Sequence, residues 1–199
     1  MKIREYKSED ENGWVRCRLL SFLDSSYYDD IKKTKESYDN PSLCLVAEDN
    51  GIIVGFIDVE YEEHAGEVCY FSGALGAVIW NIGVLPEYRR QGVATQLWNT
   101  AKVMLLDKGI RRFEVWTQND TASNAWYERQ GFVFREAYLN AYIKGNPTDA
   151  IIRKYINMKN AGAIYGIRCF NFEAPIERKN ELEQVCFRLY EVKVYELKC

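Results

Sequence analysis

The sequence predicts an α/β (α+β) fold, in which a mixed central sheet is flanked by helices. First, the 199 residues are 47% hydrophobic and 28% charged, the balance of one globular domain with room for an appendage. Second, the apolar run from Trp80 to Leu85 is typical of a buried strand that ends at Pro86, and a long helical pattern begins at Val93. Third, strand-like and helix-like runs alternate on both sides of this pair, in the order βααβββαβαβ.

The first half of the chain is expected to open with a strand and a helix. Ser8 followed by Glu11 has the form of a capping box, which predicts a helix start at Ser8. Asp49-Asn50-Gly51 is a tight-turn sequence between two β-rich runs. In order, we expect a strand at Met1–Tyr6, helices at Ser8–Phe22 and Tyr28–Tyr38, and strands at Leu43–Ala47 and Ile52–Tyr61.

The central strand and the long helix follow. Gly109 should end this helix as a C-cap glycine does. The elements expected here are a loop at Glu62–Gly76, a strand at Ala77–Val84, a helix from Val93 to Lys108, a strand at Arg112–Thr117, a helix at Thr121–Gln130 and a strand at Phe132–Lys144.

The chain divides into an expected core, residues 1–144, and an extension, residues 145–199. A segment of ~55 residues without a disulfide or a metal is only marginally stable alone, so the extension should pack on the core. Its expected elements are a helix at Asp149–Lys159, a strand at Ala163–Phe172, a helix at Pro175–Phe187 and a strand at Leu189–Lys198.

The turn between the central strand and the long helix has the features of a phosphate site. A helix N-terminus presents backbone N–H groups without intrahelical partners, and the helix dipole adds positive potential there. Gly92 has no Cβ to block a ligand that approaches the backbone. The turn lacks both the Lys-Ser/Thr ending of a Walker loop and the three glycines of a dinucleotide fingerprint.

Two motifs in this region resemble those of the GNAT N-acetyltransferase superfamily. Arg89-x-x-Gly92-x-Ala94 resembles the acyl-CoA signature, and Asn119-x-x-Ala122 followed by Tyr127-x-x-x-Gly131-Phe132 resembles the second hallmark with its spacing intact. The resemblance covers about residues 1–143 and implies the GNAT acyl-CoA N-acyltransferase fold. In that fold one more strand closes the sheet, here either Ala163–Phe172 or Leu189–Lys198.

The resemblance implies that acetyl-CoA is the co-substrate, and that no metal is needed. The central strand of the family diverges from its neighbour, so the backbone of Ile82 and Val84 should bind the pantetheine arm. Asn119 should contact the same arm, although it could instead, or in addition, cap the following helix. The residues expected to hold the pyrophosphate are Arg89, Arg90, Gln91, Gly92, Val93, Ala94 and Thr95.

Tyr127 is the residue expected to carry catalysis. By the resemblance it points at the CoA sulfur, and a phenol with a pKa near 10 can protonate a departing thiolate. The alternative is a buried aromatic that only packs the helix. A general base is less evident: Asp58, Glu60 and Glu62 share one strand face, and we select Glu60, with a solvated strand face as the alternative.

Composition excludes several classes of partner. The net charge of −3 gives no electrostatic case for nucleic acid or an anionic membrane. No apolar run is long enough to span a bilayer, and the charged N-terminus has no signal-peptide core. The six scattered cysteines favour a reducing cytoplasm, and the lone His64 has no second histidine with which to share a metal.

The function expected is acetyl transfer from acetyl-CoA to a small or peptide-borne primary amine by direct attack. The acceptor is not identified, although the acidic group Asp24, Asp29 and Asp30 slightly favours a cationic one. The alternatives are a non-catalytic CoA-binding regulatory or interaction protein, and a site for another phosphate ligand such as a nucleotide. The oligomeric state, including a homodimer, stays open.

Overall fold

The computed structural model describes residues 1–144 and 169–199. They form two units, one of Met1–Arg135 with Val194–Cys199 and one of Glu136–Lys193. The helix expected at 149–159 and most of the strand expected at 163–172 lie outside the described residues. Within the described ranges, no helix is both long and apolar enough to cross a membrane.

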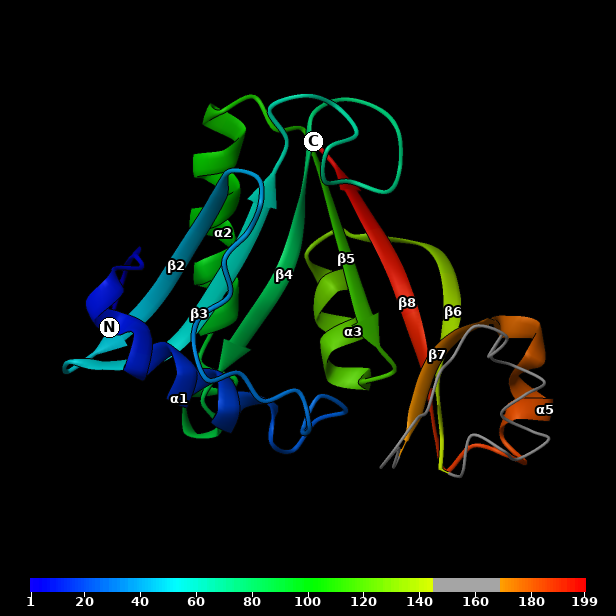
Figure 1. Ribbon diagram of the computed structural model, residues 1–199. Coiled ribbons are helices and arrows are strands. Elements are labelled where there is room, and N and C mark those ends of the chain that lie inside the picture. Colours follow the sequence, from blue (N-terminus) through cyan, green and yellow to red (C-terminus); the bar gives the residue numbers. More distant parts are fainter. Residues whose placement is uncertain (145–168) are drawn as a thin grey trace. The chain divides into compact units, whose positions relative to one another are not determined.

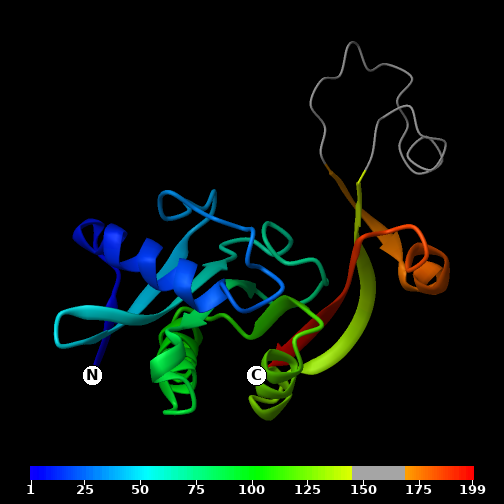
Figure 2. The ribbon, with the colours of Figure 1, turned by 90° about the horizontal axis from the view of Figure 1, so that it is seen from below.

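The first unit is built on a mixed sheet, as expected, and this confirms the α/β fold class. Its strands lie in the order β1-β2-β3-β4-β5-β8, and β4 and β5 are parallel whereas β1 to β4 pair antiparallel. Helix α1 covers one face of this sheet, and α2 and α3 cover the other (Figures 1 and 2). The bounds are β1 Lys2–Glu5, α1 Glu11–Phe22, β2 Ser42–Asp49, β3 Ile52–Tyr61, β4 Gly76–Val84, α2 Val93–Asp107, β5 Arg112–Gln118, α3 Thr121–Arg129 and β8 Arg188–Lys198.

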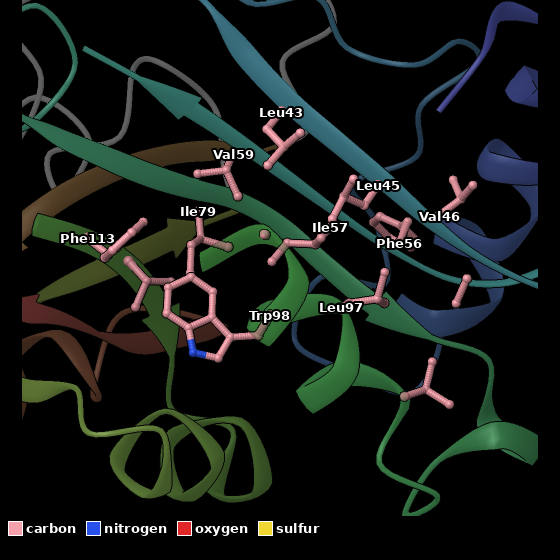
Figure 3. Close-up of a cluster of buried hydrophobic side chains, with 14 of the residues drawn as sticks. Leu43, Leu45, Val46, Phe56, Ile57, Val59, Ile79, Leu97, Trp98 and Phe113 are labelled. Atoms are coloured by element: carbon pink, nitrogen blue, oxygen red, sulfur yellow. The ribbon is translucent and has the colours of Figure 1, made fainter. Parts of the chain in front are cut away.

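The main core lies between this sheet and α2. Trp98 of α2 is 1% exposed and meets Phe113 of β5 edge to face, with the ring centroids 5.0 Å apart. Ile57 of β3 and Ile79 of β4 are buried beside them (Figure 3). Because residues two apart on a strand share a face, Ile57 lies on the same face of β3 as Val59, the residue opposite Ile79.

The helix expected at Tyr28–Tyr38 is wrong, since these residues form turns and bends. The segment has a single aliphatic residue, Ile31, and that side chain is 63% exposed, so a helix here would have no apolar face to bury. Polar contacts hold the segment instead: Asp30 pairs with Arg18 of α1 at 2.7 Å, and Lys35 pairs with Asp58 of β3 at 3.2 Å.

The expected capping box at Ser8 and Glu11 is also wrong. A short 3-10 helix at Ser8–Asp10 precedes α1, and at its start the backbone carbonyl of Lys7 accepts from the N–H of Asp10 at 2.9 Å. The carboxylate of Asp10 accepts from the backbone N–H of Lys7 at 2.8 Å and from the guanidinium of Arg4. The ion pair with Arg4 holds the Asp10 carboxylate at the start of the helix, and this explains why Asp10, rather than Glu11, accepts from the backbone N–H there.

Among the described residues of the second unit, the strands lie in the order β8-β6-β7, with β6 Val133–Ile143 and β7 Phe170–Pro175 antiparallel. Leu139, Ala141, Ala174 and Leu182 form its small core. The helix expected at Pro175–Phe187 is shorter, a 3-10 turn at Ile176–Arg178 and then α5 Lys179–Leu182. Of the two strands expected to close the sheet of the core, the last one, β8, lies next to β5.

Candidate active site

An opening in the sheet between β4 and β5 forms the centre of the candidate site. The two strands pair only from Gly76 opposite Arg112 to Val78 opposite Glu114, and then they diverge (Figure 1). This confirms the expected divergence of the central strand. A cavity of about 380 Å³ lies there and is lined by both strands, by α1 and by α3.

The backbone of β4 faces this cavity at Ile82 and Val84. The N–H of Leu85 donates to the carbonyl of Val54 in β3 at 2.9 Å. Because successive residues of an antiparallel strand direct their backbone groups to opposite sides, those of Ile82 and Val84 are directed away from β3, toward the opening. Ile82 and Val84 both line the cavity, and the carbonyl of Val84 accepts from the guanidinium of Arg89 at 3.3 Å.

A β-bulge interrupts β4 at the same level. Asp58 of β3 lies opposite Asn81, whereas the next residue, Val59, lies opposite Ile79, so Trp80 is the extra residue. The side chain of Trp80 is 51% exposed and lines the cavity. The sequence predicted the strand but not the bulge, since a bulge is defined by pairing with a distant strand.

The turn before α2 has the geometry of an anion site. Gly92 is the N-cap of α2 with a φ of +79°, and no side chain caps the helix. The first N–H groups of α2 therefore have no partner from a capping side chain. Of the seven residues predicted for the pyrophosphate, Arg89 and Ala94 line the cavity; Arg90, Gln91 and Gly92 are exposed, and Val93 is buried in the core.

The side chains of two predicted turn residues already make hydrogen bonds within the protein. The guanidinium of Arg89 donates to the carbonyl of Ser21 at 2.8 Å, which ties the turn to α1. The hydroxyl of Thr95 accepts from the indole N–H of Trp126 at 3.1 Å, which ties α2 to α3. These contacts hold the walls of the cavity on both sides of the turn.

Tyr127 of α3 lies on the wall of the cavity. Its ring is 4% exposed and packs edge to face against Trp126 and Phe132. Burial, and to a lesser degree the nearby Tyr27, raises the pKa of Tyr127 above its ordinary value. The hydroxyl makes no hydrogen bond within residues 1–144 and 169–199, so its proton is available to a ligand in the cavity.

Asn119 is exposed and is not the helix cap, so the interpretation of Asn119 as a cap is wrong. Asp120 caps α3, because its carboxylate accepts from the N–H of Ser123 at 2.8 Å. Sequence reasoning missed Asn124, whose buried amide donates to the carbonyls of Gln118 and Asp120. Asp120 lines the cavity, whereas Asn119 does not.

The acidic face of β3 is buried, which contradicts its interpretation as a solvated face. Asp58 is 0%, Glu60 6% and Glu62 1% exposed. Both oxygens of Glu60 are occupied: one accepts from the backbone and side-chain amides of Asn40, at 2.9 Å each, and the other from the indole N–H of Trp80 at 2.7 Å. Glu60 does not itself line the cavity.

Glu62 organises the loop between β3 and β4. It accepts from the backbone N–H groups of Gly66, Val68, Cys69 and Gly76. Burial raises the pKa of Glu62, but these four hydrogen bonds outweigh burial and hold the pKa below its usual value.

We expect Glu62→Gln to destabilise the fold by about 1.5–3 kcal/mol at pH 7, since hydrogen bonds to a charged group are replaced. A carboxylate with a depressed pKa in the folded state stabilises above its unfolded pKa, and this stability is lost as the pH falls. Thermal unfolding between pH 4 and pH 7 should therefore show that the variant loses less stability than the wild-type protein as the pH falls. The control is Glu63→Gln at the exposed neighbour; equal stability of the two variants at pH 7 would contradict the role of Glu62.

A buried arginine, which sequence reasoning also missed, closes the α1 side of the cavity. Arg18 is 3% exposed and donates to the carbonyl oxygen of Asp30 at 2.5 Å and to its carboxylate at 2.7 Å. Its third donor reaches the side-chain oxygen of Asn81 in β4 at 3.3 Å, and Asn81 in turn donates to Glu36. The network joins α1, the following loop and β4.

A model of the GNAT acetyltransferase family matches residues 7–132. The chain belongs to this family. As a GNAT enzyme it is an acetyltransferase that uses acetyl-CoA. Among the residues that the structure describes, no group of three or more His, Cys, Asp or Glu side chains could hold a metal ion.

Solved GNAT structures share the fold at low sequence identity. A GNAT acetyltransferase from Streptococcus pneumoniae is 15% identical with a TM-score of 0.60, and the match covers 100% of this chain and 99% of that one. The ribosomal-protein-S18-alanine N-acetyltransferase of Escherichia coli is 13% identical, with a TM-score of 0.56 and coverage of 99% and 92%. An aminoglycoside antibiotic 6'-N-acetyltransferase from Acinetobacter haemolyticus is 22% identical, with a TM-score of 0.51 and coverage of 68% and 93%.

Proposed function

We propose that this GNAT enzyme acetylates a primary amine by direct attack, with Tyr127 as the general acid. The observation that carries the proposal is the position of Tyr127, protonated through burial, on the wall of the cavity between β4 and β5. Acetyl-CoA supplies an acetyl group activated as a thioester. In the transfer the amine nitrogen bonds the acetyl carbon, the C–S bond breaks, Tyr127 protonates the leaving sulfur, and the ammonium proton passes to solvent.

The residues of the turn would hold the pyrophosphate of acetyl-CoA. Support comes from the uncapped N-terminus of α2 and from Gly92, whose positive φ leaves the backbone open on that side. Val93 would act through its backbone N–H, because its side chain is in the core. Arg89, Arg90, Gln91, Ala94 and Thr95 complete the proposed pyrophosphate site.

The β4 backbone would hold the pantetheine arm. Ile82 and Val84 direct backbone groups toward the opening, and a strand-like ligand there would pair with β4 in place of β5. Asn119 remains a proposed contact of the same arm, next to the cap residue Asp120. These groups would place the thioester beside Tyr127 and orient it for attack.

Glu60 as general base is poorly supported by the geometry. A base must first be free to accept a proton, and each oxygen of Glu60 is bound by a protein donor. We therefore propose below that Glu60 positions Trp80. A cytoplasmic location also remains a proposal, supported by the six cysteines, all of which are free thiols.

The proposed function is tested by calorimetry with acetyl-CoA, and then by release of free CoA thiol in the presence of aminoglycosides, polyamines, amino acids and N-terminal peptides. Turnover with at least one amine is the expected result. Binding of acetyl-CoA without turnover would instead support a non-catalytic CoA-binding protein. Displacement of acetyl-CoA by ATP would indicate a nucleotide site.

A further inference from the structure

Two tryptophans form a pair on the wall of the cavity. The rings of Trp80 on β4 and Trp116 on β5 are nearly parallel, at an interplanar angle of 14°, with their centroids 6.4 Å apart. Both line the cavity that Tyr127 lines. This indole pair therefore spans the opening where the two strands diverge.

Trp80 is held in place although half of its surface is exposed. The bulge directs it out of the regular strand, and its N–H donates to the buried carboxylate of Glu60. Glu60 is held in turn by two amide donors of Asn40. Burial of a carboxylate is unfavourable unless the carboxylate is hydrogen-bonded. Here the buried carboxylate of Glu60 orients the indole ring of Trp80, which faces solvent rather than the core. Such an arrangement is typical of a binding surface that is ordered before its ligand arrives.

The charges around the indole pair favour a cation. Of the basic side chains that line the cavity, Arg18 is paired with Asp30, and Arg89 donates to backbone carbonyls. Asp24 also lines the cavity, is exposed and makes no ion pair with any residue that the structure describes. Indole faces attract ammonium and guanidinium groups, and a nearby carboxylate adds to this attraction.

We propose that the indole pair binds the acceptor, and that the acceptor is an amine with a second positive charge, such as a diamine. This rests on the proposed function. The distal ammonium lies on the indole pair, in the cavity that Asp24 also lines, while the other amine reaches the thioester beside Tyr127. Glu60 is a positioning residue, which acts on the acceptor through Trp80.

The test compares cadaverine with n-pentylamine, which has the same chain but lacks the second ammonium. With the wild-type enzyme, kcat/KM should be higher for cadaverine. In Trp80→Leu and in Trp116→Leu, KM for cadaverine should rise by about 3- to 30-fold, the range of a cation–π contact. KM for pentylamine and the Kd for acetyl-CoA should not change. The control is Tyr70→Leu, which removes another exposed aromatic outside the cavity.

Glu60→Gln separates positioning from base catalysis. A positioning role predicts a higher KM for cadaverine with an unchanged pH profile of kcat; loss of kcat together with the acid limb of that profile would overturn it. If the wild-type enzyme turned over pentylamine as readily as cadaverine, the indole pair would not be an acceptor site, and the proposed function would remain intact. No thiol release with any amine would contradict the proposed function itself.

Discussion

Tyr127→Phe is expected to lower kcat by about 10²–10⁴-fold, the usual contribution of a general acid, and to leave the affinity for acetyl-CoA unchanged. The ring would still pack against Trp126 and Phe132, so only the proton donor is lost. Because burial raises the pKa of Tyr127, the wild-type enzyme should keep the acid form of Tyr127 well above pH 8. Steady-state kinetics from pH 6 to pH 10 measures both effects.

The matched control for this variant is Tyr61→Phe, which removes the hydroxyl of a tyrosine outside the cavity and should leave kcat unchanged. Because the pKa of Tyr127 is raised, its ionisation should cause no decline of kcat between pH 6 and pH 10 in the wild-type enzyme. Full kcat in Tyr127→Phe would assign Tyr127 to packing alone.

Gly92→Val should abolish or severely weaken acetyl-CoA binding. The φ of +79° is strained for any residue with a Cβ, by about 1–2 kcal/mol, and a branched side chain would also crowd a ligand at the N-terminus of α2. Gly92→Ala separates the two effects, because the nearest atom to an added Cβ is the Gln96 amide nitrogen, 3.8 Å away, so the protein itself has room for it. Calorimetry measures binding, and thermal unfolding measures the strain common to both variants. Binding by Gly92→Val as tight as that of the wild type would remove the pyrophosphate from this turn.

The parts of the site that could be predicted are those with local signals. The strand, the turn at Gly92 and the following helix are contiguous in sequence, and the spacing from Ala122 to Tyr127 and Phe132 lies within one helix and its end. These patterns extend over a few residues each, so their resemblance to the GNAT motifs could be recognised in one sequence, and it is this resemblance that singles out Tyr127.

The parts that could not be predicted depend on partners far along the chain. Asp58, Glu60 and Glu62 follow the alternation of an exposed face, yet each is buried. Asp58 and Glu60 of β3 lie against the segment after α1, and Glu62, just after β3, binds the loop before β4. The segment after α1 was predicted as a helix, but it is held by polar contacts to Arg18 and β3. Likewise, the buried amide of Asn124 meets the hydroxyl of Tyr195, 71 positions later in the chain.

The single extra residue at Trp80 divides β4 into two stretches, and odd-numbered residues point to opposite faces of the sheet in the two stretches. Before it, Ile79 lies opposite Val59; after it, Asn81 lies opposite Asp58, on the other face of β3. In an unbroken strand Ile79 and Asn81 would share a face, which would place the Asn81 amide in the apolar core. The same offset decides that Ile82 and Val84, rather than their neighbours, direct backbone groups toward the opening. Deletion of one residue from β4 would therefore invert the second half of the strand, closing the ligand side while every side chain of the turn stayed present.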